Sequence, residues 1–389
     1  MKSNYEPLGK HIQLVDYRNS EEVTSTVLGI SIDKEFMPSV ANVIGTDLSR
    51  YKLISKGLFA CNPMHVGRDE RLPIALYENE EPAIVSPAYF MFEIIDRTIL
   101  NEEYLMMWFR RPEFDRECWF MTDGSVRGGI TWDDLCRIQL PVPPYERQLD
   151  VVESYRAITR RIAMKKEIND NLEATAQAVF QEQFASFYGA DELPDGYRII
   201  NLDNLCTVKG GKRLPADCKL LDTPTDHPYI RVRDVGSNRY VCLTNQFQYI
   251  DEETYSAISR YIVNTGDIVI SIVGTIGLLG KIHSSLDKAN LTENCVKLAN
   301  IHTVTSDYLY YTLCYKKQIK EIDLLTVGAV QAKLPMYNIQ SMKILVPPTK
   351  AIEAFQRKMN VLNELIEANT VEIQKLYELE EVLLAKLSD

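Results

Sequence analysis

The sequence predicts an α+β protein in which two globular domains alternate with two long helices. Residues 124–144 and 328–348 repeat one pattern, with Gly, Val, Val, Pro and Pro at positions whose numbers differ by 204 throughout. A long stretch with the apolar period of a helix follows each copy, and short apolar runs bounded by turn residues precede it. Because this period is far too long for a solenoid, the repeated unit is a whole domain followed by a helix.

Short strand-like runs indicate that both globular domains are α+β. In the first domain, residues 1–144, these runs are Val27–Ile32 and Leu58–Cys61, and the second follows the turn at Lys56-Gly57. The second domain, residues 191–348, has three such runs: Tyr197–Leu202, Pro228–Val232 and Asp267–Ile272. We therefore expect short strands and much irregular loop in each domain.

The segments that follow the domains, residues 145–190 and 349–389, predict one long helix each. Glu146–Phe184 and Ile352–Leu387 contain no internal proline or glycine, and their apolar residues alternate by threes and fours. This spacing is typical of a coiled-coil seam. A polar residue interrupts both seams at the same place, Lys165 in one and Asn369 in the other. It either fixes the register of a coiled coil or marks a solvated helix edge. Such a helix spans about 55–60 Å, which suits a spacer.

Composition and charge narrow the classes of function. The 389 residues carry a net charge of −11, so a free-standing DNA-binding protein with a basic footprint is disfavoured. The eight cysteines include no pair at CxxC spacing, which indicates free thiols in a reducing compartment. The most apolar run, Ile268–Ile282, is too short and too glycine-rich to span a bilayer. We expect a soluble, cytoplasmic protein with no membrane partner and no metal site.

Local basic clusters in the second domain are candidates for nucleic-acid contacts. Lys209-Gly210-Gly211-Lys212-Arg213 places three cations around two glycines whose backbone amides suit a phosphate; the alternative is a solvated loop. In Tyr229–Asp234, strand alternation would put Arg231 and Arg233 on one face, for phosphates, base edges or a surface salt bridge. The turn Val273–Gly277 presents Ser271 and Thr275 to a ligand or only needs glycine for its backbone.

A catalytic alternative rests on one short pattern. Pro194-Asp195 and Asp217-Cys218-Lys219 formally fit the metal-dependent nuclease pattern PD…(D/E)xK. That chemistry needs carboxylates on adjacent strands to hold Mg²⁺, whereas both segments have the composition of turns.

Taken together and in order, the motifs resemble those of the specificity subunits of type I restriction-modification systems. The resemblance covers essentially the whole chain. The resemblance rests on these segments: the strand and glycine turn of Gly266–Gly277, the run Tyr229–Val235, the VPP-to-helix junctions at Val142 and Val346, the stretch ending at Pro63 and the run from Val85.

This resemblance implies a non-catalytic subunit that recognises double-stranded DNA. Each domain would recognise half of a bipartite target in the major groove. The helices would pair antiparallel, set the gap, and dock two methyltransferase subunits and, through them, motor-nuclease subunits. S-adenosylmethionine, ATP and Mg²⁺ would belong to those partners, and this chain would hold no cofactor. The second helix departs from the family pattern, since Thr349-Lys350-Ala351-Ile352 replaces Tyr145-Glu146-Arg147-Gln148 and its local contacts must differ.

We expect eleven side chains to contact DNA: Ser31, Lys34, Lys56 and Asn62 in the first domain, and Lys209, Lys212, Arg213, Arg231, Arg233, Ser271 and Thr275 in the second. Two other functions are alternatives: a nuclease that uses Asp195, Asp217 and Lys219, and a coiled-coil scaffold that binds only proteins.

Overall fold

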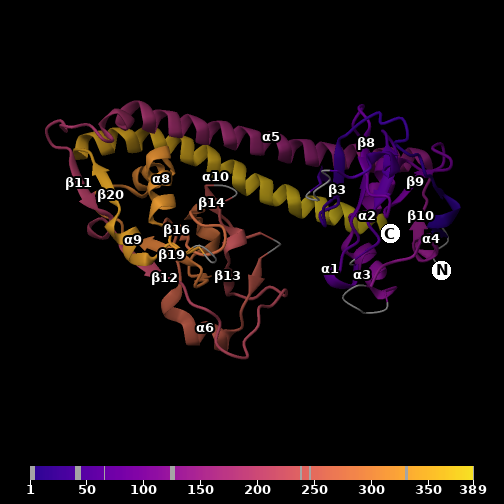
Figure 1. The fold of residues 1–389 in the computed structure, drawn as a ribbon. Coiled ribbons are helices and arrows are strands. Elements are labelled where there is room, and N and C mark those ends of the chain that lie inside the picture. Colours follow the sequence, from indigo (N-terminus) through magenta and orange to yellow (C-terminus); the bar gives the residue numbers. More distant parts are fainter. Residues whose placement is uncertain are drawn as a thin grey trace. The chain divides into compact units, whose positions relative to one another are not determined.

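A computed structural model describes residues 5–39, 45–64, 66–122, 128–236, 239–244, 247–328 and 332–388. The chain forms two compact units (Figure 1). Unit 1 comprises Met1–Met164 and Lys375–Asp389, and unit 2 comprises Lys165–Gln374. Each unit therefore holds one globular domain together with part of both long helices, α5 (Tyr145–Phe184) and α10 (Thr349–Ala385). The predicted α+β class and the two predicted helices are confirmed.

The described residues of unit 1 form two four-stranded sheets and a two-stranded ribbon. The ribbon pairs β1 (Tyr5–Pro7) with β10 (Gln139–Pro141). The first sheet, antiparallel throughout, has the order β2 (Ile12–Leu14), β9 (Phe90–Ile94), β6 (Phe59–Cys61) and β7 (Ile74–Leu76). The second has the order β4 (Phe36–Pro38), β3 (Val27–Ile30), β8 (Ala83–Val85) and β5 (Lys52–Ile54), with β3 and β8 parallel. Its helices are α1 (Val66–Asp69), α2 (Glu102–Phe109), α3 (Pro112–Phe120) and α4 (Trp132–Arg137).

In unit 2, the part of the chain that the structure describes forms a five-stranded sheet, a three-stranded sheet and a ribbon of β11 (Arg198–Asn201) with β20 (Lys343–Val346). The larger sheet has the order β12 (Thr207–Gly210), β19 (Cys295–Ala299), β16 (Ile268–Ser271), β17 (Leu279–Ile282) and β14 (Tyr240–Val241). The smaller has the order β15 (Gln248–Tyr249), β13 (Pro228–Ile230) and β18 (Asn290–Leu291). Its helices are α6 (Glu252–Ile258), α7 (Ser306–Cys314), α8 (Lys316–Leu325) and α9 (Met336–Ser341).

The repeat extends further towards the N-terminus of each copy than the sequence motif indicated. Helices α2, α3 and α4 begin 204 positions before α7, α8 and α9. The buried Tyr104 hydroxyl donates to the Pro141 carbonyl at 3.1 Å, and the buried Tyr308 hydroxyl donates to the Leu345 carbonyl at 2.7 Å. Both the donors and the acceptors are 204 apart. Residues 124–127 and 329–331 of the repeated motif lie outside the described residues.

In each unit, α5 and α10 pack antiparallel along the predicted seam, which is buried at Tyr155, Phe355 and Met359 and half-buried at Ile158 and Leu383. In unit 1, the Tyr155 hydroxyl of α5 donates to the Glu380 carboxylate of α10 at 2.8 Å. In unit 2, the end of α5 meets the start of α10, where the rings of Phe184 and Phe355 lie 5.6 Å apart between centroids. Phe180 and Tyr308 join this fully buried cluster and tie the helix pair to α7.

The polar interruption of the seam is an interhelical contact. The Lys165 ammonium of α5 donates to the Asn369 side-chain oxygen at 2.8 Å, and it pairs with the Glu372 carboxylate at 2.9 Å. The Asn369 amide donates to Asn169 at 2.9 Å, and Asn369 is buried. The alternative of a solvated helix edge is therefore wrong. Because Lys165 and Asn369 occupy equivalent positions in the repeat, the two helices cross here in a locally two-fold manner.

The two domain-to-helix junctions make different contacts, as expected from the different residues at the starts of α5 and α10. In unit 1, the fully buried Gln148 amide donates to the carbonyls of Ile99 and Pro143, both at 2.8 Å, and its oxygen accepts from the Asn101 N–H at 2.9 Å. In unit 2, the equivalent Ile352 is buried in the apolar core instead. Three hydrogen bonds at one junction are thus replaced by packing at the other.

Candidate nucleic-acid interface

Four segments of unit 2 meet where the strands of its two sheets end. The register places Ser271 of β16 opposite Cys295 of β19, and Gly210 of β12 lies opposite Val296. The Thr292 N–H donates to the Ile230 carbonyl at 3.0 Å, which brings the end of β13 to the same place. We call residues 209–213, 231–234, 271–277 and 292–295 together the basic edge. They contain five cations and two carboxylates, although the whole chain is acidic.

The paired glycines of the basic edge serve a close contact between two backbone segments. The Gly211 N–H donates to the Cys295 carbonyl at 3.0 Å, and the Lys212 N–H donates to the Leu291 carbonyl at 2.8 Å. A Cβ on Gly211 would lie 2.0 Å from the Thr292 carbonyl oxygen, so a side chain does not fit. The Gly211 amide is thus satisfied within the protein, which corrects the expectation that it is offered to a phosphate.

The cations beside these glycines remain at the surface. Lys209 and Lys212 are exposed, and the Lys212 ammonium lies 5.7 Å from the centre of the Tyr261 ring. The Arg213 side chain is 83% exposed, and its guanidinium pairs with the Glu293 carboxylate at 2.9 Å. A surface pair of this kind is weak and exchanges readily, so the three cations are accessible to an anionic ligand.

The two arginines after β13 have different roles, because the strand is shorter than predicted. It ends at Ile230, and a 3-10 turn covers Val232–Asp234. The half-buried Arg231 guanidinium donates hydrogen bonds to both carboxylate oxygens of Asp234, at 2.9 and 3.0 Å, and to the side-chain oxygen of Gln248. The Arg233 side chain is 65% exposed and lies 3.9 Å from the same carboxylate. Arg231 therefore stabilises the turn, whereas Arg233 faces solvent. This difference corrects the prediction that both arginines lie on one face of a strand.

Ser271 also shapes a loop. It is fully buried, its hydroxyl donates to the Thr275 carbonyl at 2.6 Å, and the hydroxyl oxygen accepts from the Leu278 N–H at 2.9 Å. Gly274 and Gly277 adopt φ of 82° and 81°, which confirms the turn that needs glycine. Thr275 is exposed at the tip of this turn. The exposed Lys333, which sequence reasoning missed, lies beside the turn because its backbone forms an isolated β-bridge with Val273.

In unit 1, Lys34 is an interior residue. Its ammonium donates to the Asp115 carboxylate at 2.6 Å and to the Leu72 carbonyl at 3.0 Å, and its side chain is only 5% exposed. Burial lowers the pKa of Lys34, and Asp115 opposes that change. This position corrects the prediction that Lys34 presents its charge to DNA.

The other three predicted residues of unit 1 do not form one surface. Lys56 is exposed and paired with Glu80 at the start of β6, whereas Asn62 follows the end of that strand. The Asn62 side-chain oxygen accepts from the Met64 N–H at 3.2 Å, and the Ser31 oxygen accepts from the Glu35 N–H at 3.2 Å. Asn62 and Ser31 thus stabilise turns, and both residues are half-buried.

The nuclease arrangement is not found among the described residues. Asp195 lies in the turn closed by the Tyr197 N–H and the Pro194 carbonyl, and Asp217 has φ of 72° in another turn. Neither they nor Lys219 lie in a strand. Nowhere in the described chain do three His, Cys, Asp or Glu side chains gather in a way that could hold a metal ion.

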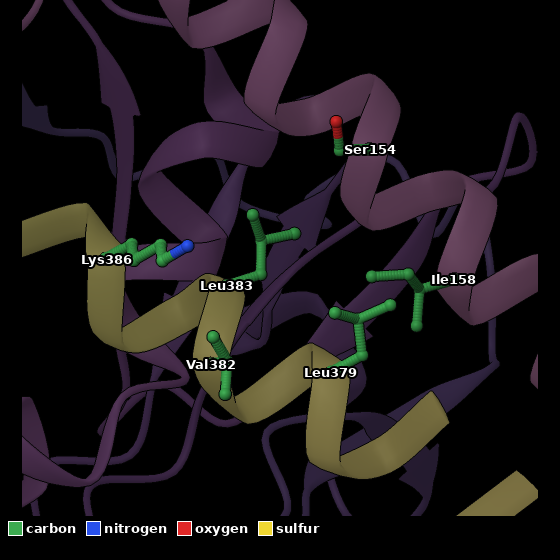
Figure 2. Close-up of a pocket in the computed structure, with 6 residues that line it drawn as sticks. All are labelled: Ser154, Ile158, Leu379, Val382, Leu383 and Lys386. Carbon is green, nitrogen blue, oxygen red and sulfur yellow. The ribbon is translucent and has the colours of Figure 1, made fainter. Parts of the chain in front are cut away.

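The long helices carry apolar side chains on their surfaces. A pocket of about 300 Å³ lies between α5 and α10 in unit 1. Figure 2 shows that Ile158 of α5 faces Leu379 and Leu383 of α10 in this pocket. Leu379 and Val382 are each 51% exposed, and in unit 2 Val361 and Leu365 of α10 are also exposed. Among the described residues, no helix combines the length and apolar character needed to cross a lipid bilayer.

Comparison with known proteins connects this fold to DNA specificity. Residues 194–381 match the family profile of the type I restriction modification DNA specificity domain. The chain is 21% identical to the type I restriction enzyme MjaIX specificity subunit of Methanocaldococcus jannaschii, over 76% of this chain and 70% of that protein. It is 20% identical to the type I restriction enzyme HindI specificity subunit of Haemophilus influenzae, over 90% and 89%.

A solved structure has the same fold. The crystal structure of the type I restriction-modification system S subunit from M. genitalium matches with a TM-score of 0.50 and 15% identity, over 98% of this chain and 95% of that one. The arrangement of α+β domains alternating with long helices is thus one that this chain shares with that S subunit. Residues 194–381 belong to the family of type I restriction modification DNA specificity domains, and the chain is similar to type I specificity subunits along most of its length, as the resemblance indicated. These are DNA-sequence-recognition subunits rather than catalytic ones.

Proposed function

We propose that each unit recognises one half of a bipartite DNA target, and that the helix pair holds the two half-sites at a fixed gap. The observation that carries this proposal is the duplication, which extends from the recognition domains into both helices and includes the buried hydrogen bonds of Tyr104 and Tyr308. A protein built twice from one unit suits a target that is read in two parts.

In unit 2, the basic edge is the proposed DNA-contacting surface. Lys209, Lys212, Arg213, Arg233 and Thr275 are exposed there, with Lys333 beside them. Cations on such loops bind phosphates and, in the major groove, the acceptor atoms of guanine. Arg231 and Ser271 support this surface by fixing its turns. In unit 1, Lys56, Asn62 and Ser31 stay proposed contacts.

The helices are the proposed docking surface for two methyltransferase subunits. Their exposed apolar side chains favour a protein partner over DNA, since a phosphate backbone offers nothing apolar to bury. S-adenosylmethionine, ATP and Mg²⁺ would be held by the methyltransferase and motor-nuclease partners. Since DNA and free thiols are both found in the cytoplasm, we place the protein there.

Exchange of one recognition domain tests the proposal. Residues 1–144 are replaced by the corresponding domain of another family member, and DNA methylation is mapped in restriction-deficient cells that carry the methyltransferase partner. We expect one half-site to change while the other half-site stays the same. A change in both half-sites, or in neither, would contradict the assignment of one domain to each half.

A further inference from the structure

A buried charged cluster joins the second recognition domain to both long helices inside unit 2. It consists of Arg239, Lys281, Asp307, Glu173, Tyr311, Gln356 and Asn363, and we call it the Arg239 cluster. Arg239 directly precedes β14, Lys281 lies on β17, and Asp307 and Tyr311 lie on α7. Glu173 belongs to α5, and Gln356 and Asn363 belong to α10.

The Arg239 guanidinium is the centre of the cluster. Its side chain is 1% exposed, and it forms an ion pair with Asp307, whose side chain is 4% exposed. It also donates to the Tyr311 hydroxyl at 2.9 Å and to the Asn363 side-chain oxygen at 2.5 Å. The Glu173 carboxylate lies 3.7 Å away. One side chain therefore contacts α7, α5 and α10 at once.

The remaining contacts link the other members of the cluster to one another. The Lys281 ammonium pairs with Asp307 at 2.6 Å. The other oxygen of Asp307 accepts from the amides of Gln356 at 2.6 Å and Asn363 at 2.8 Å. The Tyr311 hydroxyl donates to Glu173 at 2.9 Å. Two cations and two carboxylates balance, which the low dielectric of a buried site requires.

The polar contacts of this domain continue along one face of α10. His283 approaches the Glu367 carboxylate at 3.6 Å, and the Gln374 amide donates to the Leu243 carbonyl at 2.8 Å. Residues 356, 363, 367 and 374 are spaced by seven, four and seven, so they share one stripe of the helix. Hydrogen bonds are directional, whereas apolar packing tolerates sliding, and a stripe of this kind fixes one orientation.

Unit 1 does not repeat this arrangement. The residues 204 positions before Asn363 and Gln356 are Thr159 and Val152, and the residue 204 positions after Glu173 is Tyr377. The equivalent of Asp307 is Glu103, which pairs with Arg156 of α5, a side chain that is 49% exposed. A solvated pair of this kind contributes little to orientation.

We infer that Arg239 is a positioning residue, which fixes the angle of the second recognition domain on the helix pair and so restricts the DNA gap that the protein accepts. This inference rests on the proposed function. Arg239 lies in the interior and does not contact DNA, so its effect is on the relation between half-sites and not on the bases recognised.

The test uses the full chain with its methyltransferase partner in restriction-deficient cells, with methylated bases mapped by sequencing. The variant E173Q/N363A removes the charge of Glu173 and the amide of Asn363, the two groups of the long helices that face Arg239, and leaves the Arg239–Asp307–Lys281 ion pairs in place. R239M removes the centre of the cluster. T159A, at the position of unit 1 that is equivalent to Asn363, is the matched control.

We expect E173Q/N363A to methylate sites whose gap differs by one base pair from the native gap. The methylation of these sites should rise at least tenfold over that given by the native chain, with both half-site sequences unchanged. R239M should give the same or a larger effect, provided that thermal unfolding shows the variant to be folded. T159A should methylate the same sites as the native chain. Native gap selectivity with full methylation in E173Q/N363A would overturn the inference. If the native chain itself gives no split motif, the proposed function fails first, and the two failures are thereby distinguished.

Discussion

The two units attach a similar domain to the same helix pair by different chemistry. In unit 1, the buried Gln148 makes three hydrogen bonds at the start of α5, and the acidic residue of α2, Glu103, pairs with a half-exposed arginine. In unit 2, the start of α10 is apolar at Ile352, and the equivalent acid, Asp307, lies in a buried ionic cluster. The starts of equivalent helices and the hydrogen bonds of Tyr104 and Tyr308 are kept, while the charged contacts differ. The duplication thus preserves architecture and leaves each junction free to be built separately.

The largest expected difference between the units concerns the aromatic cluster of unit 2. Phe355 is fully buried against Phe180, Phe184 and Tyr308, whereas its equivalent in unit 1 is the half-buried Val151. We expect F355A to lower the free energy of unfolding by about 3–5 kcal/mol, because it removes a large buried ring and leaves a cavity. V151A should cost about 1 kcal/mol. Urea unfolding of the full chain measures both; equal losses would contradict this comparison.

The next largest effect is expected at the junctions. Q148L removes the partners of two carbonyls and one N–H in a buried place, so we expect a loss of about 2–3 kcal/mol of folding free energy. I352Q, the reverse exchange in unit 2, buries an amide among apolar side chains and should cost a similar amount. The double variant Q148L/I352Q should be close to the sum, since the positions lie in separate cores. An I352Q protein as stable as the native chain would show that this junction has polar partners.

Acid should weaken unit 2 through Asp307. Burial alone would raise the pKa of this carboxyl, but Lys281 and Arg239 outweigh it and hold the pKa at about 2. Because the folded pKa lies below the unfolded one, the stabilisation is present above about pH 4 and is lost as the pH falls towards 2. The corresponding contribution is about 2 kcal/mol. Stability measured by urea unfolding at several pH values should fall less steeply in this window for D307N than for the native chain. Identical slopes would contradict this role of Asp307.

The smallest effect is expected from single cations of the basic edge. K212A should lower the slope of log affinity against log salt by about one unit and weaken DNA binding by the assembled complex several-fold, whatever the sequence. K10A, an exposed lysine of unit 1 outside the proposed surface, is the control and should leave the slope unchanged. Equal slopes for K212A and the native chain would remove Lys212 from the interface.

The parts of the fold that depend on local pattern could be predicted from the sequence. The two helices and their seam follow from periodicity and repetition. The polar interruption at Lys165 and Asn369 is visible too, but the sequence leaves a register-fixing contact and a solvated helix edge both open. The burial of Lys34 could not be foreseen, because its partner Asp115 is distant in sequence and a lysine in a turn normally faces water. The strand at Arg231 ends early because the Asp234 carboxylate accepts from the Arg231 N–H and stabilises a turn. The Arg239 cluster combines side chains from four elements with that of Arg239, which precedes β14, and no spacing rule connects them.

Methylation mapping with the native chain and its methyltransferase partner tests the central claim most directly. If two equivalent recognition units are held by one helix pair in a fixed register, every modified site must contain two half-sites separated by a constant number of unspecified base pairs. A contiguous motif, a gap that varies freely among modified sites, or the absence of any motif would contradict that claim.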